Sequence, residues 1–141
     1  MYEAVQSLPH QAGRCTVELS QTIKDELNGA TRVIACGMGG SAFPMEIVKS
    51  TVGVPVQIHR DYADTLDTSD TNALYLLMSF SGNTEEVLDC AYTLSKYNVR
   101  IVVVTNGGKL AAFSEEHGMV RLGFPSLPAD FQPRCATGYF L

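Results

Sequence analysis

The feature that most constrains the fold of this chain is a pattern that occurs three times. A short β-rich segment is followed by a loop rich in glycine or hydroxyl residues and then by a helical pattern. The segments are residues 32–36, 74–78 and 101–104, and the loops after them are residues 37–41, 79–84 and 105–108. Residues 74–78 are apolar throughout, which is typical of a strand buried on both faces of a parallel sheet. Strands that alternate with helices through short loops require a parallel sheet with right-handed crossovers. The sequence therefore predicts an α/β fold.

Apolar periodicity predicts the other elements. Helices are expected over residues 15–27, 44–48, 85–97 and 109–116. Two more strands are expected over residues 54–58 and 119–122. Asn28 and Gly29 end the first helix, Pro44 is expected in the first turn of the second, and Pro55 favours an edge strand. The predicted architecture is a three-layer sandwich with a five-stranded parallel sheet, of the flavodoxin-like type.

Size and charge limit the classes of function. The chain has 141 residues and a mass of 15.3 kDa, the usual size of one domain. Ten basic and fifteen acidic residues give a formal charge of −5, so no basic field attracts nucleic acid or an anionic membrane. The N-terminal residues 1–14 do not have the pattern of a signal peptide, and the longest apolar run, residues 73–78, is too short to span a bilayer. We expect a cytoplasmic protein with no nucleic-acid or membrane partner.

The cysteines do not indicate a metal or disulfide framework. They are widely scattered, with no C-x-x-C pair and no histidine at a zinc-ligand spacing, at positions Cys15, Cys36, Cys90 and Cys135. We expect reduced, buried thiols and no metal site.

The first loop is a candidate anion site. Residues 37–42, GMGGSA, fit the pattern G-x-G-x-x-A, and Asp61 follows the next strand, where an acid binds a ribose in dinucleotide sites. Glycines at Gly39 and Gly40 let the backbone approach an anion, and the following helix N-terminus favours negative charge. The anion belongs to a nucleotide or to a sugar phosphate. The alternative is a tight strand-to-helix turn without a ligand.

The second loop favours phosphate. Ser79, Ser81 and Thr84 place three hydroxyls around Gly82 at the start of a helix. Capping a helix needs one hydroxyl, whereas a phosphate accepts several hydrogen bonds. In the predicted sheet this loop follows the strand next to the first loop, so Ser41 is expected to join the same phosphate site. Simple helix capping is the alternative.

Four motifs in order resemble the bifunctional phosphoglucose/phosphomannose isomerases, which are built from sugar isomerase (SIS) domains. The motifs are GMGGSA at 37–42, SFSGNTEE at 79–86, TNGGKL at 105–110 and QPRCATGY at 132–139. The resemblance covers nearly the whole chain. It implies that the hydroxyls of Ser41, Ser79, Ser81 and Thr84 hold the phosphate of a hexose 6-phosphate. It also implies that Arg134 reaches the sugar end, where its charge stabilises an enediolate.

The resemblance also implies what is missing from the chain. The family enzymes resemble two such domains in tandem, and their proton-shuttling glutamate and ring-opening histidine come from the second half. We therefore expect residues 1–141 to be a single SIS domain, with a helical lead over 1–30 and, over 131–141, the start of a helix toward an absent second domain. Isomerisation needs a base within hydrogen-bond distance of the substrate, so activity of this chain alone stays open. The implied reaction needs neither a metal nor a redox cofactor.

Several other polar residues are candidates for this site. Lys109 follows two glycines at a strand end and is a candidate for the pocket, with a solvated helix-end lysine as the alternative. Glu85 and Glu86 fit the first turn of a helix, where acids complement the dipole, and the histidines fit structural or solvated positions. Pairing with a second SIS domain or with a second copy is expected. The rivals to the enzyme are a non-catalytic phosphosugar-sensing module and, less favoured, a nucleotide-binding module.

Overall fold

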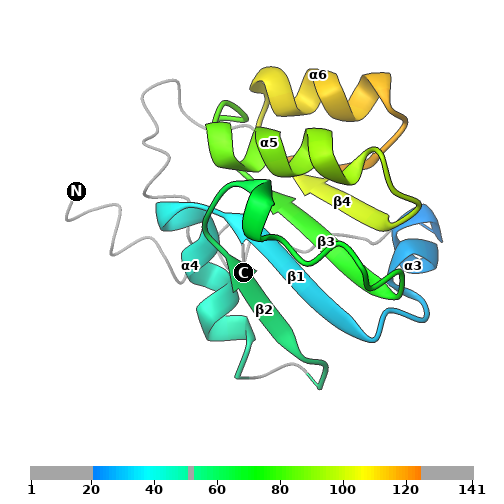
Figure 1. Cartoon of the computed structure of the whole chain (residues 1–141). Coiled ribbons are helices and arrows are strands. Elements are labelled where there is room, and N and C mark those ends of the chain that lie inside the picture. Colours follow the sequence, from blue (N-terminus) through cyan, green and yellow to red (C-terminus); the bar gives the residue numbers. More distant parts are fainter. Residues whose placement is uncertain (1–20, 51–52, 125–141) are drawn as a thin grey trace.

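The computed structural model describes residues 21–50 and 53–124, which form a parallel sheet with helices on both faces (Figure 1). The strands are β1 (Arg32–Gly37), β2 (Val56–His59), β3 (Ala73–Met78), β4 (Arg100–Val104) and β5 (Val120–Leu122). The helices are α3 (Gln21–Leu27), α4 (Gly39–Val48), the 3-10 turn η1 (Ala63–Thr65), α5 (Glu85–Leu94) and α6 (Gly108–Glu116). The predicted alternation of strand and helix is confirmed.

The sheet has five parallel strands in the order β2-β1-β3-β4-β5, which confirms the predicted fold class. Among the described strands, β2 lies at an edge of the sheet, as Pro55 indicated. The central pairings join Gly37 to Met78 and Met78 to Val104 at the carboxyl ends of the strands. Because these ends are level, the loops that follow β1, β3 and β4 leave the sheet side by side.

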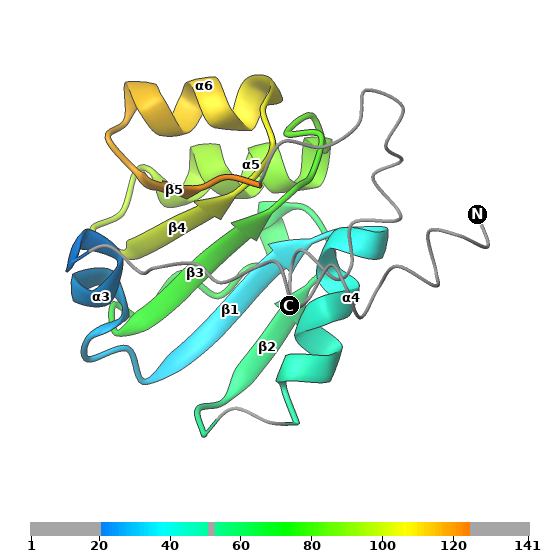
Figure 2. The ribbon, with the colours of Figure 1, turned by 180° about the vertical axis from the view of Figure 1, so that it is seen from behind.

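Two apolar clusters hold the layers together. Helices α5 and α6 lie over one face of the sheet, and α4 lies over β1 and β2 on the other, as Figure 2 shows from behind. The larger cluster, under α5 and α6, includes fully buried Tyr75, Leu77 and Leu94. The smaller one, under α4, includes Met45 and Met78. Residues of β3 therefore contribute to both cores, which explains why this strand is apolar throughout.

Two helices differ from their predicted limits by more than one residue. α4 begins at Gly39 rather than at residue 44, so Pro44 lies inside the helix and not in its first turn. The glycines before Ser41 enter the helix themselves, and the Pro44 side chain is fully buried. α5 ends at Leu94 instead of residue 97. The amides of Lys96 and Tyr97 bond three residues back and tighten the last turn, with Tyr97 N at 3.0 Å from Leu94 O.

The described cysteines, Cys36 and Cys90, are buried free thiols, as expected. Contact with the Cys90 thiol, and then burial, raise the pKa of the Cys36 thiol well above its ordinary value. Cys15, Cys135 and Arg134 lie outside the described residues, as do the predicted first part of the N-terminal helix and residues 131–141. Among the described helices, none is long and apolar enough to cross a membrane.

Candidate functional site

The site is built where three strands end at one edge of the sheet. The loops after β1, β3 and β4 each lead into a helix, respectively α4, α5 and α6. The first-turn amides of a helix have no partner within the helix, and the helix dipole makes this end positive. Three helix N-termini therefore begin at the same edge, which is the geometry that favours an anion.

Ser41 joins the first loop to the second. Its backbone amide donates to the carbonyl of Met38 at 3.1 Å, which turns the chain into α4. Its hydroxyl accepts a hydrogen bond from the backbone amide of Phe80 at 3.4 Å. Ser41 lies 39 positions away from Phe80 in the sequence, so this contact exists only because β1 and β3 are neighbours. The predicted meeting of Ser41 with the hydroxyl loop is thus present in the structure.

The hydroxyls of the second loop have different environments. Ser79 is 1% exposed, and its Oγ accepts from the amide of Gly82 at 3.1 Å and hydrogen-bonds Thr84 Oγ1 at 2.8 Å. Thr84 is the N-cap residue of α5, yet its side chain makes no capping hydrogen bond. Ser81 is exposed, and its Oγ accepts from the amide of Asn83 at 3.2 Å. The hydroxyls shape the loop rather than cap the helix.

Glycines let the second and third loops touch backbone to backbone. Gly82 has φ +67°, and a Cβ built there would overlap the carbonyl oxygen of Gly107. Gly108 has φ +69°, and a Cβ there would overlap the carbonyl oxygen of Ser81. Any L side chain at either position would be strained by its φ and blocked by the facing loop. The glycines of these two loops are therefore required by packing.

Asn83 is a positioning residue that the sequence reasoning missed. Its side-chain oxygen accepts from the backbone amide of Lys109 at 3.2 Å, and its side-chain nitrogen donates to the carbonyl of Ser81 at 3.2 Å. The amide of Leu110 also donates to the carbonyl of Gly82 at 2.9 Å. Asn83 thus links the start of α6 to the hydroxyl loop. Its signal in the sequence is its place between a loop glycine and the N-cap threonine.

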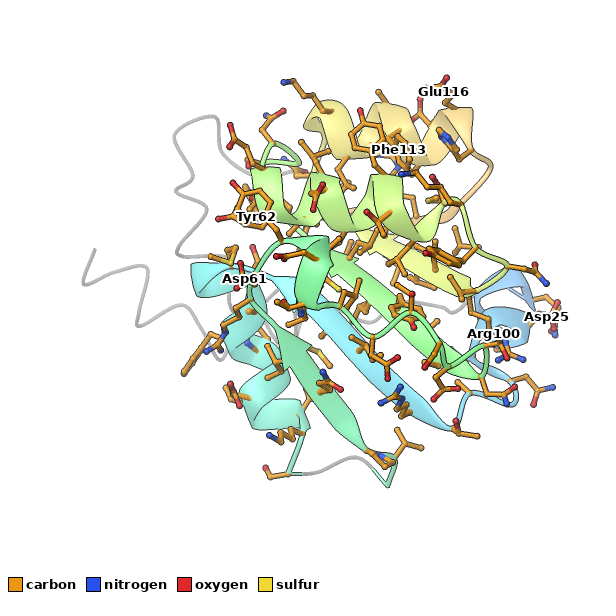
Figure 3. All side chains as sticks on the ribbon, viewed as in Figure 1. Asp25, Asp61, Tyr62, Arg100, Phe113 and Glu116 are labelled. Carbon is orange, nitrogen blue, oxygen red and sulfur yellow. The ribbon has the colours of Figure 1, made fainter. Side chains whose placement is uncertain are left out.

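Lys109 and the acids of α5 set the local charge. The Lys109 side chain is exposed in the first turn of α6, where it can approach a ligand above the loops. Glu85 and Glu86 occupy the first turn of α5, as the dipole argument predicts. The hydroxyl of Tyr62, which is labelled in Figure 3, lies 3.5 Å from Glu85 Oε2. The Glu85 side chain is therefore turned toward the segment after β2. Partial desolvation, followed by the charges of Glu85 and Glu86, raises the pKa of Tyr62.

The other candidate residues lie around this edge. Gly39, with φ +50°, faces open space, and Gly40 follows it in the first turn of α4. Asp61 follows β2, and its Oδ1 accepts from the amide of Tyr62 at 2.8 Å. His59 is buried, and its Nε2 bonds the carbonyl of Tyr62 at 3.0 Å. Within residues 21–50 and 53–124, no group of histidine, cysteine and carboxylate side chains is placed to hold a metal ion.

Solved structures share this architecture. The Vibrio vulnificus NanR protein complexed with ManNAc-6P has a TM-score of 0.65 at 19% identity, over 99% of this chain and 55% of that one. A Bacteroides fragilis NCTC 9343 protein, described as a phosphosugar isomerase involved in capsule formation, has a TM-score of 0.66 at 20% identity, over 99% and 83% of the two chains. The sugar isomerase domain of an RpiR transcription factor from Sphaerobacter thermophilus has a TM-score of 0.64 at 13% identity, over 99% and 82%. The fold is that of a SIS, or sugar isomerase, domain.

The chain is also similar in sequence to curated enzymes, which narrow the class of protein further. The chain is 32% identical over 145 residues to the bifunctional phosphoglucose/phosphomannose isomerase of Caldicellulosiruptor bescii, covering 99% of this chain and 41% of that protein. It is 31% identical over 128 residues to the enzyme of that name from Thermoplasma acidophilum, covering 84% and 39%. It is also 34% identical over 113 residues to a D-glucosamine-6-phosphate 4-epimerase of Sulfolobus acidocaldarius, covering 78% and 35%.

The chain is thus a homologue of the bifunctional phosphoglucose/phosphomannose isomerases, as its motifs predicted. It spans about two fifths of the length of the curated relatives it matches. No family model matches the chain.

Proposed function

We propose that this chain binds the phosphate group of a hexose 6-phosphate at the three loops of the carboxyl edge. The contact between the Ser41 hydroxyl and the Phe80 amide carries the proposal, because it brings the first loop onto the hydroxyl loop. The names of the relatives and neighbours support this ligand class: they include enzymes of phosphosugars and a protein complexed with ManNAc-6P.

The proposed phosphate contacts follow from exposure. Ser81, which is exposed, and the partly exposed Ser41 and Thr84 donate their hydroxyls directly to phosphate oxygens. Buried Ser79 holds Gly82 and Thr84 in place through its hydroxyl. When the Thr84 hydroxyl donates to the ligand, the Ser79 hydroxyl donates to Thr84 Oγ1. Gly39 and Gly40 leave the backbone of the first loop open to the anion, and the Lys109 ammonium adds charge.

We propose isomerisation of glucose or mannose 6-phosphate to fructose 6-phosphate as the parent reaction. Moving a proton between C2 and C1 needs a base near the substrate and stabilisation of the enediolate that forms. We assign the stabilisation of the enediolate to Arg134, because the motif around it resembles that of the isomerases. The base and the ring-opening acid are assigned to a second SIS domain that pairs with residues 1–141, in the same polypeptide or in another copy.

Amide NMR of the purified chain tests the binding site. Fructose 6-phosphate is expected to shift the amides of the three loops, whereas free fructose and NAD leave them unchanged. Ser81→Ala is expected to weaken binding about 10- to 150-fold, the effect of losing one hydrogen bond to a charged group, which is about 1.5–3 kcal/mol. Ser95→Ala is the matched control, because its hydroxyl bonds the Tyr92 carbonyl at the other end of α5.

Two results would contradict this proposal. Shifts caused by NAD alone, and lost in Asp61→Ala but not in Ser81→Ala, would establish the nucleotide-binding alternative. Equal weakening by Ser81→Ala and Ser95→Ala would show that the hydroxyl loop does not contact the ligand.

A phosphosugar-sensing module is the second candidate. The names of two structural neighbours, one of them an RpiR transcription factor and the other a NanR protein complexed with a phosphosugar, favour it. A coupled assay of glucose 6-phosphate formation from fructose 6-phosphate separates the two functions. Turnover that Arg134→Ala abolishes supports the isomerase, and tight binding without turnover in the complete protein supports the sensor.

A further inference from the structure

A pocket surrounds Arg100 at the end of the sheet opposite the hydroxyl loops. Its volume is about 610 Å³, and its lining residues are Thr68, Thr71, Tyr97, Asn98, Val99 and Arg100. Arg100 is the first residue of β4, and the loop that follows this strand belongs to the phosphate site. About 16 Å of strand separate the two places, so one small ligand does not reach both. Figure 3 shows Arg100 near α3, across the molecule from Asp61 and Tyr62.

The guanidinium of Arg100 forms no ion pair with a carboxylate of the described residues. Its Nη1 atom is buried and has no hydrogen-bond partner in this part of the chain. The arginines of β1, of the segment after β2 and of β5 each form an ion pair with a carboxylate, and no described carboxylate forms one with Arg100. A Cβ built on Gly29 would lie 3.7 Å from Nη2, so the turn after α3 packs beside the guanidinium. A partly buried charge without a partner is costly, which favours an acceptor brought from outside.

The neighbouring acids are already engaged. Arg32 binds Asp67 through Nη2 and Asp70 through Nε, each at 2.7 Å. Asp67 also accepts from the hydroxyl and amide of Ser69, and Asp70 from the amide of Asn72. Arg32 and its two acids carry one net negative charge beside the pocket. A dianion would be repelled by these carboxylates, whereas a single negative charge balances Arg100.

A smaller pocket adjoins the first. It has a volume of about 240 Å³ and shares Tyr97 and Val99 with the Arg100 pocket. Further apolar side chains line it, namely Ile101, Met119 and Val120. His117 also lines it, and this ring is fixed by a hydrogen bond from Nδ1 to the Phe113 carbonyl at 3.0 Å. The two pockets together place the Arg100 guanidinium beside apolar residues, of which Tyr97 and Val99 line both pockets.

We propose that the Arg100 pocket binds a small monocarboxylate with a short apolar chain. The carboxylate pairs with the guanidinium, the hydroxyls of Thr68 and Thr71 and the Asn98 amide donate to its oxygens, and the apolar chain lies against Tyr97 and Val99. Arginine suits this role because its planar donors match the two oxygens of a carboxylate. The inference does not rest on the proposed phosphosugar site, since the two sites share no residue.

Titration of the full ¹⁵N-labelled chain with isovalerate tests this site, with neutral isovaleramide as the isosteric control. Isovalerate is expected to give saturable shifts of Arg100 Nε, the Asn98 side-chain amide and the Thr71 amide, and isovaleramide to give none. Arg100→Gln is expected to weaken binding at least tenfold. Arg121→Gln, which removes an ion-paired charge from the neighbouring strand β5, should change affinity less than twofold.

Three results would contradict the proposed carboxylate site. The first is that isovaleramide binds as well as isovalerate. The second is that inorganic phosphate binds at residues 98–100 more tightly than isovalerate does. The third is that Arg121→Gln weakens binding as much as Arg100→Gln does. If Arg100→Gln does not fold, Arg100→Lys replaces it, and the comparison of acid with amide on the unmodified chain remains decisive. Shifts at residues 79–84 report only on the phosphosugar site, so the two proposals fail separately.

Discussion

A single absent methyl group at position 82 decides whether two loops of the site can meet. Gly82 has a positive φ and its Cα faces the Gly107 carbonyl oxygen, so its lack of a side chain serves both conformation and packing. Gly39 also has a positive φ, but a Cβ there would meet nothing within 4 Å. The two glycines therefore separate the conformational cost of a side chain from its steric cost.

We predict that Gly82→Ala destabilises the protein by about 2–5 kcal/mol, combining left-handed strain with overpacking. Gly39→Ala is the matched control and should cost only about 1–2 kcal/mol, the conformational part. Urea unfolding followed by circular dichroism measures both. A Gly82→Ala variant as stable as Gly39→Ala would mean that the two loops separate at little cost.

The buried hydroxyl of Tyr75 is a second residue with a measurable role. Tyr75 is fully buried in the larger core, and its hydroxyl donates to the carbonyl of Asp67 at 2.7 Å. Tyr75→Phe leaves that carbonyl without this donor, and we expect a loss of about 1 kcal/mol in the free energy of unfolding. Tyr92→Phe, at an exposed position on α5, should change stability by less than about 0.5 kcal/mol. Equal effects in the two variants would assign no stabilising role to the buried hydrogen bond.

At the scale of elements, an ion-pair cluster ties the start of β1 to the segment before β3. Arg32 belongs to β1, and its two partners, Asp67 and Asp70, precede β3. Hydrogen bonds from Ser69, and then the bond from Arg32, hold the pKa of Asp67 well below its ordinary value. The folded state therefore binds a proton at Asp67 less readily than the unfolded chain does.

The sign of the pH dependence follows from this difference. The contribution of Asp67 to stability is complete above the unfolded pKa of about 3.9 and is lost as the pH falls toward the lower, folded pKa. We expect Asp67→Asn to lower the urea midpoint at pH 6 and the gap from the unmodified chain to shrink by pH 3. Asp64→Asn, at an exposed position on η1, is the control. A gap that is constant with pH would show that Asp67 does not stabilise the fold through its charge.

The elements were predictable to different degrees. Strand β3 was predicted within one residue because its apolar run is a local signal of burial on both faces. The start of α4 was predicted wrongly because glycines score as loop residues, although Gly39 and Gly40 enter the helix here. The link from Asn83 to Lys109 was not predictable, since it depends on segments that only the fold brings together. The same holds for the buried Nη1 atom of Arg100, which has no hydrogen-bond partner among residues 21–50 and 53–124.

At the scale of the whole molecule, stability is concentrated in the middle of the sheet. Among the described strands, β1, β3 and β4 each have neighbours on both sides, whereas β2 and β5 pair on one side only. We predict that amide hydrogen exchange is slowest in β1, β3 and β4, because their opening requires global unfolding. Exchange measured by NMR checks this order. Equally slow exchange in β2 would show that the edge opens only with the core.

The backbone contact between Gly82 and Gly107 also bears on how this chain can change by mutation. A side chain at position 82 is admissible only if the 105–108 loop takes another path, and a new path there removes the surface on which Gly108 faces Ser81. In a library of random variants, survivors altered in one loop should therefore carry compensating changes in the other. The two loops would evolve as one unit, although more than twenty residues, including all of α5 and β4, separate them along the chain.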